Sequence, residues 1–113
     1  MKLHQYFLYI VTNPTKTVLY VGIANNLPQR ITEHYLSRSS QKTFAGRYYC
    51  YNLIYFEMGK YVEDIIRREK EIKGWTRKKK EILIESENPE WRFLNEDIME
   101  WPPGKDAMKR SDV

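Results

Sequence analysis

The stretch from residue 7 to residue 34 constrains the fold of this chain more than any other part of the sequence. It contains two strand-like runs rich in aromatic and β-branched residues, Tyr6 to Val11 and Val18 to Ile23. Between them stands Asn-Pro-Thr-Lys at residues 13–16, and asparagine followed by proline favours a type I turn. The stretch therefore predicts a β-hairpin.

The turn also predicts which residues of the hairpin face each other. If the turn alone sets the register, the numbers of paired residues sum to 29, so Tyr9 lies opposite Tyr20 on one face. A longer loop or a bulge would shift this pairing. We expect the two phenols to share one site.

A helix follows the hairpin, from Leu27 to about Leu36. Asparagines precede the segment as candidate caps, and Pro28 suits the first turn. Arg30 and His34 fall beside the apolar stripe of this helix, where a cation needs a partner in the protein body. The hairpin is the expected partner.

The rest of the chain completes a small fold. Leu53 to Phe56 predicts a third strand, and Tyr61 to Lys73 has helical spacing. Thr76 can cap a further helix that begins with Arg77. These elements predict an α/β (α+β) domain in which three helices flank a three-stranded, mainly antiparallel sheet.

The segment from Ser37 to Gly46 is expected to be a mobile polar loop. The cations in and beside it are Arg38, Lys42 and Arg47. Contact with phosphates and simple solvation of a surface loop are both open interpretations of this segment.

Composition places the chain in a broad class. Its 113 residues, 42% hydrophobic and 30% charged, suit one domain with a modest core. We assign that domain to residues 1–95 and expect residues 96–113 to be a flexible tail. The single cysteine, Cys50, favours a reducing cytoplasm, and no apolar run is long enough to cross a membrane. The net charge of +4 favours a polyanionic partner.

Two charged features of the later helices indicate candidate functional residues. Glu69 falls on the apolar stripe of its helix, and a carboxylate placed there is either ion-paired or metal-bound. A buried structural ion pair between Arg30 and Glu69 is the main alternative. Lys73 and the run Arg77, Lys78, Lys79 and Lys80 lie close by in sequence, and cations at a helix N-terminus oppose its dipole. This placement favours phosphate contact over a merely solvated helix end.

The joint spacing of these residues resembles the GIY-YIG nuclease domain, over roughly residues 5–95. Phe7-Leu8-Tyr9 stands where that family has Gly-Ile-Tyr, and Tyr20-Val21-Gly22 stands where it has Tyr-Ile-Gly. Residues 66–75 resemble the helix with the metal-binding glutamate, and Asn88-Pro89-Glu90-Trp91 is similar to the close of small single-domain bacterial members. Phe7 departs from the pattern, because it replaces a glycine.

The resemblance implies a metal-dependent endonuclease that hydrolyses phosphodiester bonds by direct attack of water. Tyr9 is the implied general base and His34 a proton relay, while Tyr20 orients the water or the phosphate. Arg30 would stabilise the charge on phosphorus, and Glu69 would hold Mg²⁺ or Mn²⁺, which needs few protein ligands. Gly22 and Asn88 are expected to support the site.

The expected substrate is nucleic acid, with DNA as the first choice, in repair or nucleic-acid processing. The alternative is a non-catalytic nucleic-acid-binding module that keeps the fold, whereas a protein-binding adaptor has little support. We expect no membrane partner, and a partner protein could supply specificity. The sequence leaves open the oligomeric state, the choice between DNA and RNA, and the choice between branched and linear substrates.

Overall fold

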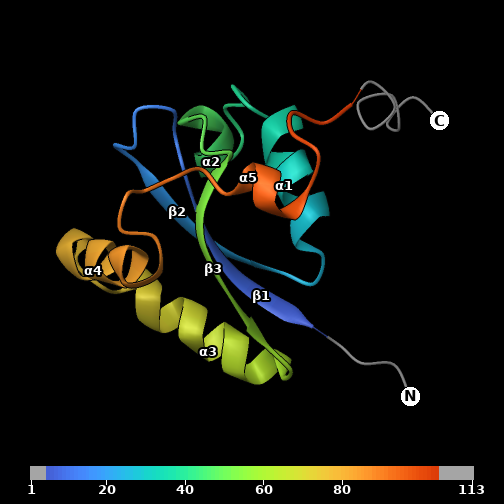
Figure 1. Ribbon diagram of the computed structural model, residues 1–113. Helices are drawn as coiled ribbons and strands as arrows, with labels where there is room; N and C mark the ends of the chain where they lie inside the picture. The colour runs from blue at the N-terminus through green and yellow to red at the C-terminus, as the bar shows by residue number, and fades with distance from the viewer. Residues whose placement is uncertain (1–4, 105–113) are drawn as a thin grey trace, which may run out of the picture.

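Three antiparallel strands form the centre of the protein in the computed structural model, which describes residues 5–104. The strands are β1 (Tyr6–Thr12), β2 (Leu19–Ala24) and β3 (Asn52–Gly59). They are arranged in the order β2-β1-β3, so β1 is the central strand (Figure 1). The predicted antiparallel sheet is confirmed, and β3 extends on both sides of its expected bounds.

Five helices are described, where three were expected. They are α1 (Leu27–Leu36), α2 (Phe44–Arg47), α3 (Val62–Lys73), α4 (Arg77–Glu87) and α5 (Asn95–Ile98). The two additional helices have four residues each, too short to show a helical period in the sequence. The expected caps of the longer helices are confirmed, because Asn26 caps α1 and Thr76 caps α4.

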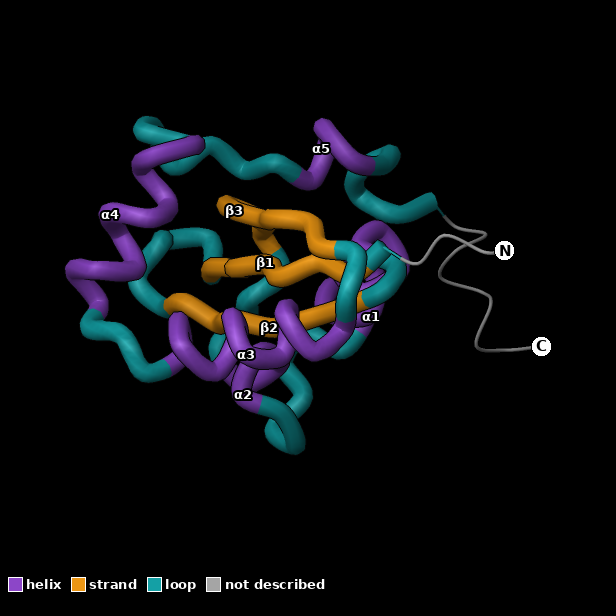
Figure 2. The backbone as a smooth tube through the Cα atoms, turned by 90° about the horizontal axis from the view of Figure 1, so that it is seen from below, coloured by secondary structure: helices purple, strands orange, loops and turns teal. Residues whose placement is uncertain are grey.

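The helices cover both faces of the sheet (Figures 1 and 2). On one face, Leu8 and Ile10 of β1 pack with Ile65 and Ile72 of α3 and Ile84 of α4. On the other face, residues of α1, α2 and α5 pack around Tyr9, Val11 and Leu53. Because β1 and β3 are covered on both faces, apolar residues occupy successive positions along these strands and do not alternate with polar ones.

The hairpin register differs from the expected one by two residues. Tyr9 pairs with Gly22, and Val11 pairs with Tyr20. The expected turn is present, with Lys16 N donating to Asn13 O. However, the Asn13 side-chain oxygen also accepts from the backbone N–H groups of residues 17 and 18, so the loop extends to residue 18. A shift of two keeps Tyr9 and Tyr20 on the same face, although they are no longer directly opposite.

A β-bulge in β3 connects the sheet to the segment after α4. Ile10 pairs with Tyr55 and Val11 pairs with Leu53, which leaves Ile54 as the extra residue. The Ile54 carbonyl accepts instead from the side chain of Asn88.

Asn95 makes similar contacts seven residues further along the chain. Its side chain accepts from Leu53 N at 2.8 Å and donates to Tyr51 O at 2.9 Å. The backbone of residue 94 also donates to Leu53 O. Two buried amides therefore fasten residues 88–95 to the outer side of β3.

Described residues beyond the expected domain boundary also pack on the protein. Ile98 and Met99 contact the core on the α1 side, and the Trp101 ring lies 5.0 Å from that of Tyr35. The packed part of the chain thus extends past residue 95. The expected tail at residues 105–113 lies outside the described residues. None of the helices in the described part is both long and apolar enough to cross a membrane.

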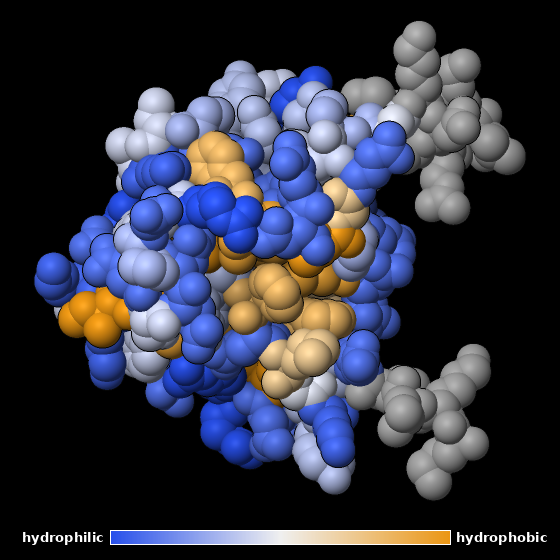
Figure 3. All heavy atoms as spheres, viewed as in Figure 1, coloured by the Kyte–Doolittle hydropathy of each residue, from blue (hydrophilic) through white to orange (hydrophobic). Residues whose placement is uncertain are grey.

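One part of the sheet carries hydrophobic side chains at the surface. Figure 3 shows hydrophobic residues gathered near the middle of one face, over the region of β1 and β3. Phe7 pairs with Met58 across these strands, and its ring lies 6.5 Å from that of Phe56. Phe7, which replaces the family's glycine, therefore packs against β3 and also against the buried cluster around Tyr9.

Candidate active site

Tyr9 lies at the centre of the site, and a glycine makes room for it. The partner of Tyr9 across the hairpin is Gly22, and a Cβ atom on Gly22 would lie 2.5 Å from Tyr9 Oη and 2.6 Å from Cζ. The Tyr9 ring therefore lies directly over the backbone of β2, which only glycine permits. This contact gives the predicted supporting residue Gly22 a specific structural role.

Tyr9 is almost fully buried, with an exposed fraction of 1%. Tyr9 is therefore not part of an open surface, because its ring packs between β2 and α1. Burial raises the pKa of Tyr9 well above its ordinary value; Tyr20 adds to this, and the positive charge of Arg30 opposes it. The phenol is neutral at pH 7.

His34 contacts both tyrosines. Its Nε2 atom is hydrogen-bonded to Tyr9 Oη at 2.7 Å, and its ring lies 5.6 Å from each tyrosine ring. Burial, with a smaller effect from Arg30, lowers the pKa of His34 to about 4. The imidazole is therefore neutral at pH 7, and in the tautomer with its proton on Nδ1 it accepts from the Tyr9 hydroxyl.

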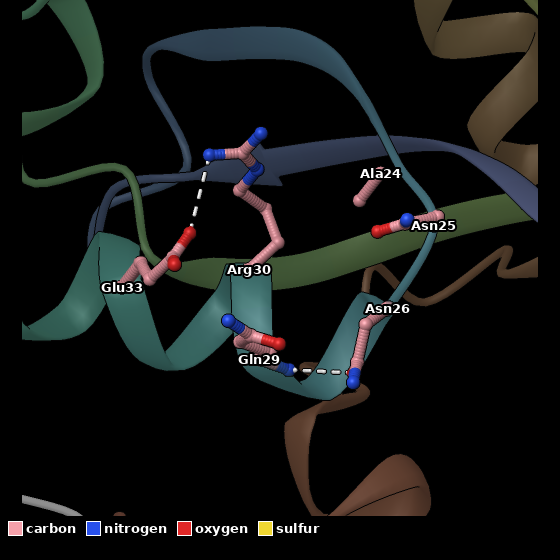
Figure 4. Close-up of a pocket in the computed structure, with 6 residues that line it drawn as sticks. All are labelled: Ala24, Asn25, Asn26, Gln29, Arg30 and Glu33. Atoms are coloured by element: carbon pink, nitrogen blue, oxygen red, sulfur yellow. Dashed lines mark hydrogen bonds and ion pairs between the residues drawn. The ribbon is translucent and has the colours of Figure 1, made fainter. Parts of the chain in front are cut away.

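Arg30 is half exposed and stands beside this pair. Its guanidinium donates to Glu33 Oε1 at 3.2 Å, one turn along α1 (Figure 4). Both partners are about 50% exposed, with side-chain values of 47% and 51%, so water competes for both groups. The rival interpretation, a buried pair between Arg30 and Glu69, is not what the structure shows.

Glu69 approaches the site from α3. Its side chain is 18% exposed and forms one loose ion pair, 3.5 Å from Lys73 Nζ. The carboxylate is near enough to Tyr9 to contribute to its raised pKa. Lys73 in turn lies 5.7 Å from the centre of the Tyr20 ring. The five predicted catalytic residues thus converge from β1, β2, α1 and α3.

Two pockets of about 200 Å³ adjoin the site, and Arg30 and Glu33 line both. The pocket shown in Figure 4 extends from Ala24 to the start of α1. The other is bounded by Tyr20, His34 and the start of α2. Arg30 therefore stands where an extended ligand could occupy both pockets.

The cations at the start of α4 have two different roles. Arg77 donates to Thr17 O at 2.8 Å and pairs with Glu81, so it ties α4 to the hairpin loop. Lys79 lies 4.5 Å from the centre of the Trp75 ring, with its ammonium over that ring. Lys78 is exposed, and Lys80 is partly exposed. Arg77 thus has a structural function that the sequence did not reveal.

Asn88 is a structural residue in this fold. Both N–H groups of its amide donate to backbone carbonyls, those of residues 54 and 92, and its oxygen accepts from Arg92 N. Its contacts hold the chain after α4 against β3 and do not include the five predicted catalytic residues.

The sequence interpretation missed two members of the site. Glu33 was signalled only by its spacing of three residues from Arg30. Phe44 stacks on Tyr20, with ring centres 6.2 Å apart and an angle of 25° between the planes. An isolated phenylalanine in a polar segment was the signal that could have identified it.

The fold and the site together define an α+β domain in which a tyrosine from each hairpin strand meets arginine, histidine and glutamate from two helices. Residues 5–81 match the family model described as the GIY-YIG catalytic domain. The chain belongs to this family, and the resemblance inferred from the sequence is confirmed.

Relatives of the chain are small bacterial proteins. It is similar to a UPF0213 protein of Bacillus pumilus, with 31% identity over 85 residues, which cover 75% of this chain and 84% of that protein. A solution NMR structure of a UPF0213 protein from Bacillus halodurans aligns with a TM-score of 0.49 and 24% identity, covering 77% of this chain and 89% of that one.

Proposed function

We propose that this protein is a divalent-metal-dependent endonuclease that hydrolyses phosphodiester bonds of nucleic acid, with DNA as the first choice. The observation that carries the proposal is the convergence of Tyr9, Tyr20, Arg30, His34 and Glu69 at one site. Membership of the GIY-YIG family supports a nuclease-like function.

The buried pair of Tyr9 and His34 is suited to proton transfer. Tyr9 begins as a neutral phenol because its pKa is raised, so it does not act as a free phenolate. We infer that Tyr9 Oη accepts the proton of the attacking water while its own proton passes to His34 Nε2, which lies 2.7 Å away. The water oxygen forms a bond to phosphorus, and the bond to the leaving oxygen breaks; that oxygen departs with the bonding electron pair and takes up a proton from solvent.

Arg30 and Tyr20 are placed to contact the phosphate. The guanidinium is half exposed and can exchange its surface ion pair with Glu33 for a phosphate, because such pairs contribute about 0–1 kcal/mol. Arginine binds phosphate with two parallel hydrogen bonds. We assign to Arg30 the stabilisation of charge that develops on the phosphorus oxygens.

Glu69 is the residue that would hold Mg²⁺ or Mn²⁺. The described residues contain no group of three or more His, Cys, Asp or Glu side chains that could hold a metal. One carboxylate nevertheless suits Mg²⁺, which keeps several waters and also binds phosphate oxygens. The loose contact of Glu69 with Lys73 leaves carboxylate oxygens available, and a bound ion would neutralise charge on the phosphate.

Binding of the rest of the substrate is assigned to cations around the site. Lys73 adjoins Tyr20, while Lys78, Lys79 and Lys80 form an outer group on α4. We also infer a cytoplasmic location, in DNA repair or other nucleic-acid processing, where a partner protein would supply specificity.

Cleavage by the wild-type protein and by a Glu69→Gln variant tests the proposal. With Mg²⁺ and a panel of linear and branched DNA and RNA, the substitution should lower cleavage by a factor on the order of 10² or more, and binding should stay nearly intact. Glu71→Gln on the exposed side of α3 is the matched control and should cleave like the wild type. A wild-type protein that binds nucleic acid but never cleaves it would favour the non-catalytic module.

A further inference from the structure

An exposed aromatic surface adjoins the site at α2. Phe44 is the first residue of this short helix and Tyr48 is its C-cap, and their ring centres lie 4.8 Å apart. Their exposed fractions are 48% and 42%, although large aromatic side chains are usually well buried. We call these two residues the α2 platform.

The α2 platform is held firmly in place. Thr43 caps the helix by accepting from Gly46 N, and Cys50 N donates to Ala45 O at 2.8 Å. Gly46 is packed so closely that a Cβ atom there would lie 2.8 Å from the carbonyl oxygens of residues 37 and 40. The rings are therefore presented on a fixed backbone, which lowers the entropic cost of binding.

The platform is continuous with the catalytic residues. Phe44 stacks on Tyr20, and Tyr20 meets the His34 ring edge to face. One pocket is lined by all three of these residues and by Arg30. A flat group resting on Phe44 would therefore lie next to a phosphate held by Arg30.

The charge around the platform identifies its ligand. Residues 37–50 include no acidic residue, and Lys42 and Arg47 stand beside Phe44 in the sequence. Exposed aromatic rings next to cations are the combination that binds single-stranded nucleic acid, because each base stacks on a ring while its phosphate meets a cation.

Building on the proposed function, we propose that the α2 platform stacks an unpaired base of the substrate next to the phosphodiester bond that is cleaved. A base inside a duplex has its faces covered by its neighbours, so it presents only its edges to a protein. The platform therefore selects single-stranded, frayed or flapped nucleic acid over continuous duplex.

Binding measurements on the full chain test this proposal. Each protein carries Glu69→Gln, which suppresses cleavage of the probe. The probes are a labelled single-stranded DNA, the same sequence as RNA, and a blunt duplex. Phe44→Ala should weaken single-strand binding by about 5- to 150-fold, the range expected for one stacked base. Duplex binding should stay close to that of the parent protein.

Two further variants make the test specific. Phe44→Leu keeps the apolar packing but removes the ring, so it should weaken single-strand binding as Phe44→Ala does. Tyr61→Ala, which removes a still more exposed aromatic ring at the start of α3, should change neither affinity. With the unsubstituted platform, a 2-aminopurine base in the DNA probe should also lose fluorescence on binding, because stacking quenches it.

The outcomes separate the two proposals. Equal effects of Phe44→Ala on the single strand and the duplex, or no 2-aminopurine quenching, would overturn the stacking platform while nuclease activity stands. Cleavage confined to continuous duplex would do the same. A wild-type protein that neither binds nor cleaves any nucleic acid probe would overturn both. The DNA and RNA arms show which sugar the site prefers, and a Phe44 effect on either supports the platform.

Discussion

Replacing Gly22 by alanine should directly disturb Tyr9, the proposed general base. The added Cβ would lie 2.5 Å from Tyr9 Oη, 2.6 Å from Cζ and 3.0 Å from Cε1. These atoms belong to a ring with an exposed fraction of 1%, so it has little space into which to move. We expect Gly22→Ala to push the phenol away from His34 and to lower both stability and activity.

Two opposing effects set the size of the change in stability. Alanine in a strand is favoured over glycine by about 0.5–1 kcal/mol, because the unfolded chain loses less freedom. Forcing an extra carbon into a packed core costs about 1–3 kcal/mol. The steric cost exceeds the entropic gain over most of this range, so the variant should be less stable than the wild type.

Substitutions of Tyr9 show whether contact with its ring causes the loss of stability in Gly22→Ala. Tyr9→Leu removes all three of the atoms in close contact, whereas Tyr9→Phe leaves Cζ and Cε1 in place. Gly22→Ala should therefore stay costly in the Phe background and become neutral or stabilising in the Leu background. The expected coupling energy with Tyr9→Leu is about 1–3 kcal/mol.

Urea unfolding followed by tryptophan fluorescence measures these free energies, since the chain has three tryptophans. The same cost of Gly22→Ala in all three Tyr9 backgrounds would refute the reasoning, because the steric contact would then not be the origin of the effect.

Three further predictions follow from other parts of the structure. The pKa of His34 is about 4 in the folded protein and near 6.5 in the unfolded chain, so the unfolded state binds more protons between these pH values. The free energy of unfolding should therefore fall as the pH drops from about 6.5 to 4. His34→Gln should lose this part of the pH dependence in urea titrations, and a variant as steep as the wild type would contradict the burial. Replacing Lys78, Lys79 and Lys80 by alanine should flatten the salt dependence of nucleic-acid binding by up to about one unit of slope per lost phosphate contact, whereas an unchanged slope would place the run outside the interface. Asn95→Ala should cost about 2–4 kcal/mol in thermal or urea unfolding, because two backbone groups of Tyr51 and Leu53 lose their partners. Glu90→Ala, at an exposed position between Asn88 and Asn95, should be nearly neutral.

The sequence predicted those parts of the fold that depend on local periodicity and caps. The strands and the three long helices appear where alternation, helical spacing, Pro28 and Thr76 place them. The hairpin register was wrong because the Asn13 side chain extends the loop, an interaction that strand patterns do not reveal. The bulge at Ile54 depends on partners far along the chain and was likewise invisible.

The sequence predicted which residues form the candidate site, but it did not predict the contacts among them. Family spacing identified residues that converge in the structure. Which charge pairs with which depends on side-chain reach, so the pairing of Arg30 with Glu33, and not with Glu69, could not be derived. The burial of Tyr9 depends on its exact partner across the hairpin, and the register prediction had assigned a different one.

The contacts of Asn88 and Asn95 with β3 indicate how much of the chain is needed for a stable fold. The family match ends at residue 81, but outer hydrogen-bonding groups of Leu53 and Ile54 in β3 are satisfied by residues 88–95. A chain cut after residue 81 would keep the five proposed catalytic residues and leave an exposed sheet edge. Such an edge is a template for pairing with another chain, so the shortened protein should aggregate or add a foreign strand. We therefore expect residues 88–95, which contribute none of the proposed catalytic residues, to protect this part of the sheet edge from pairing with another chain.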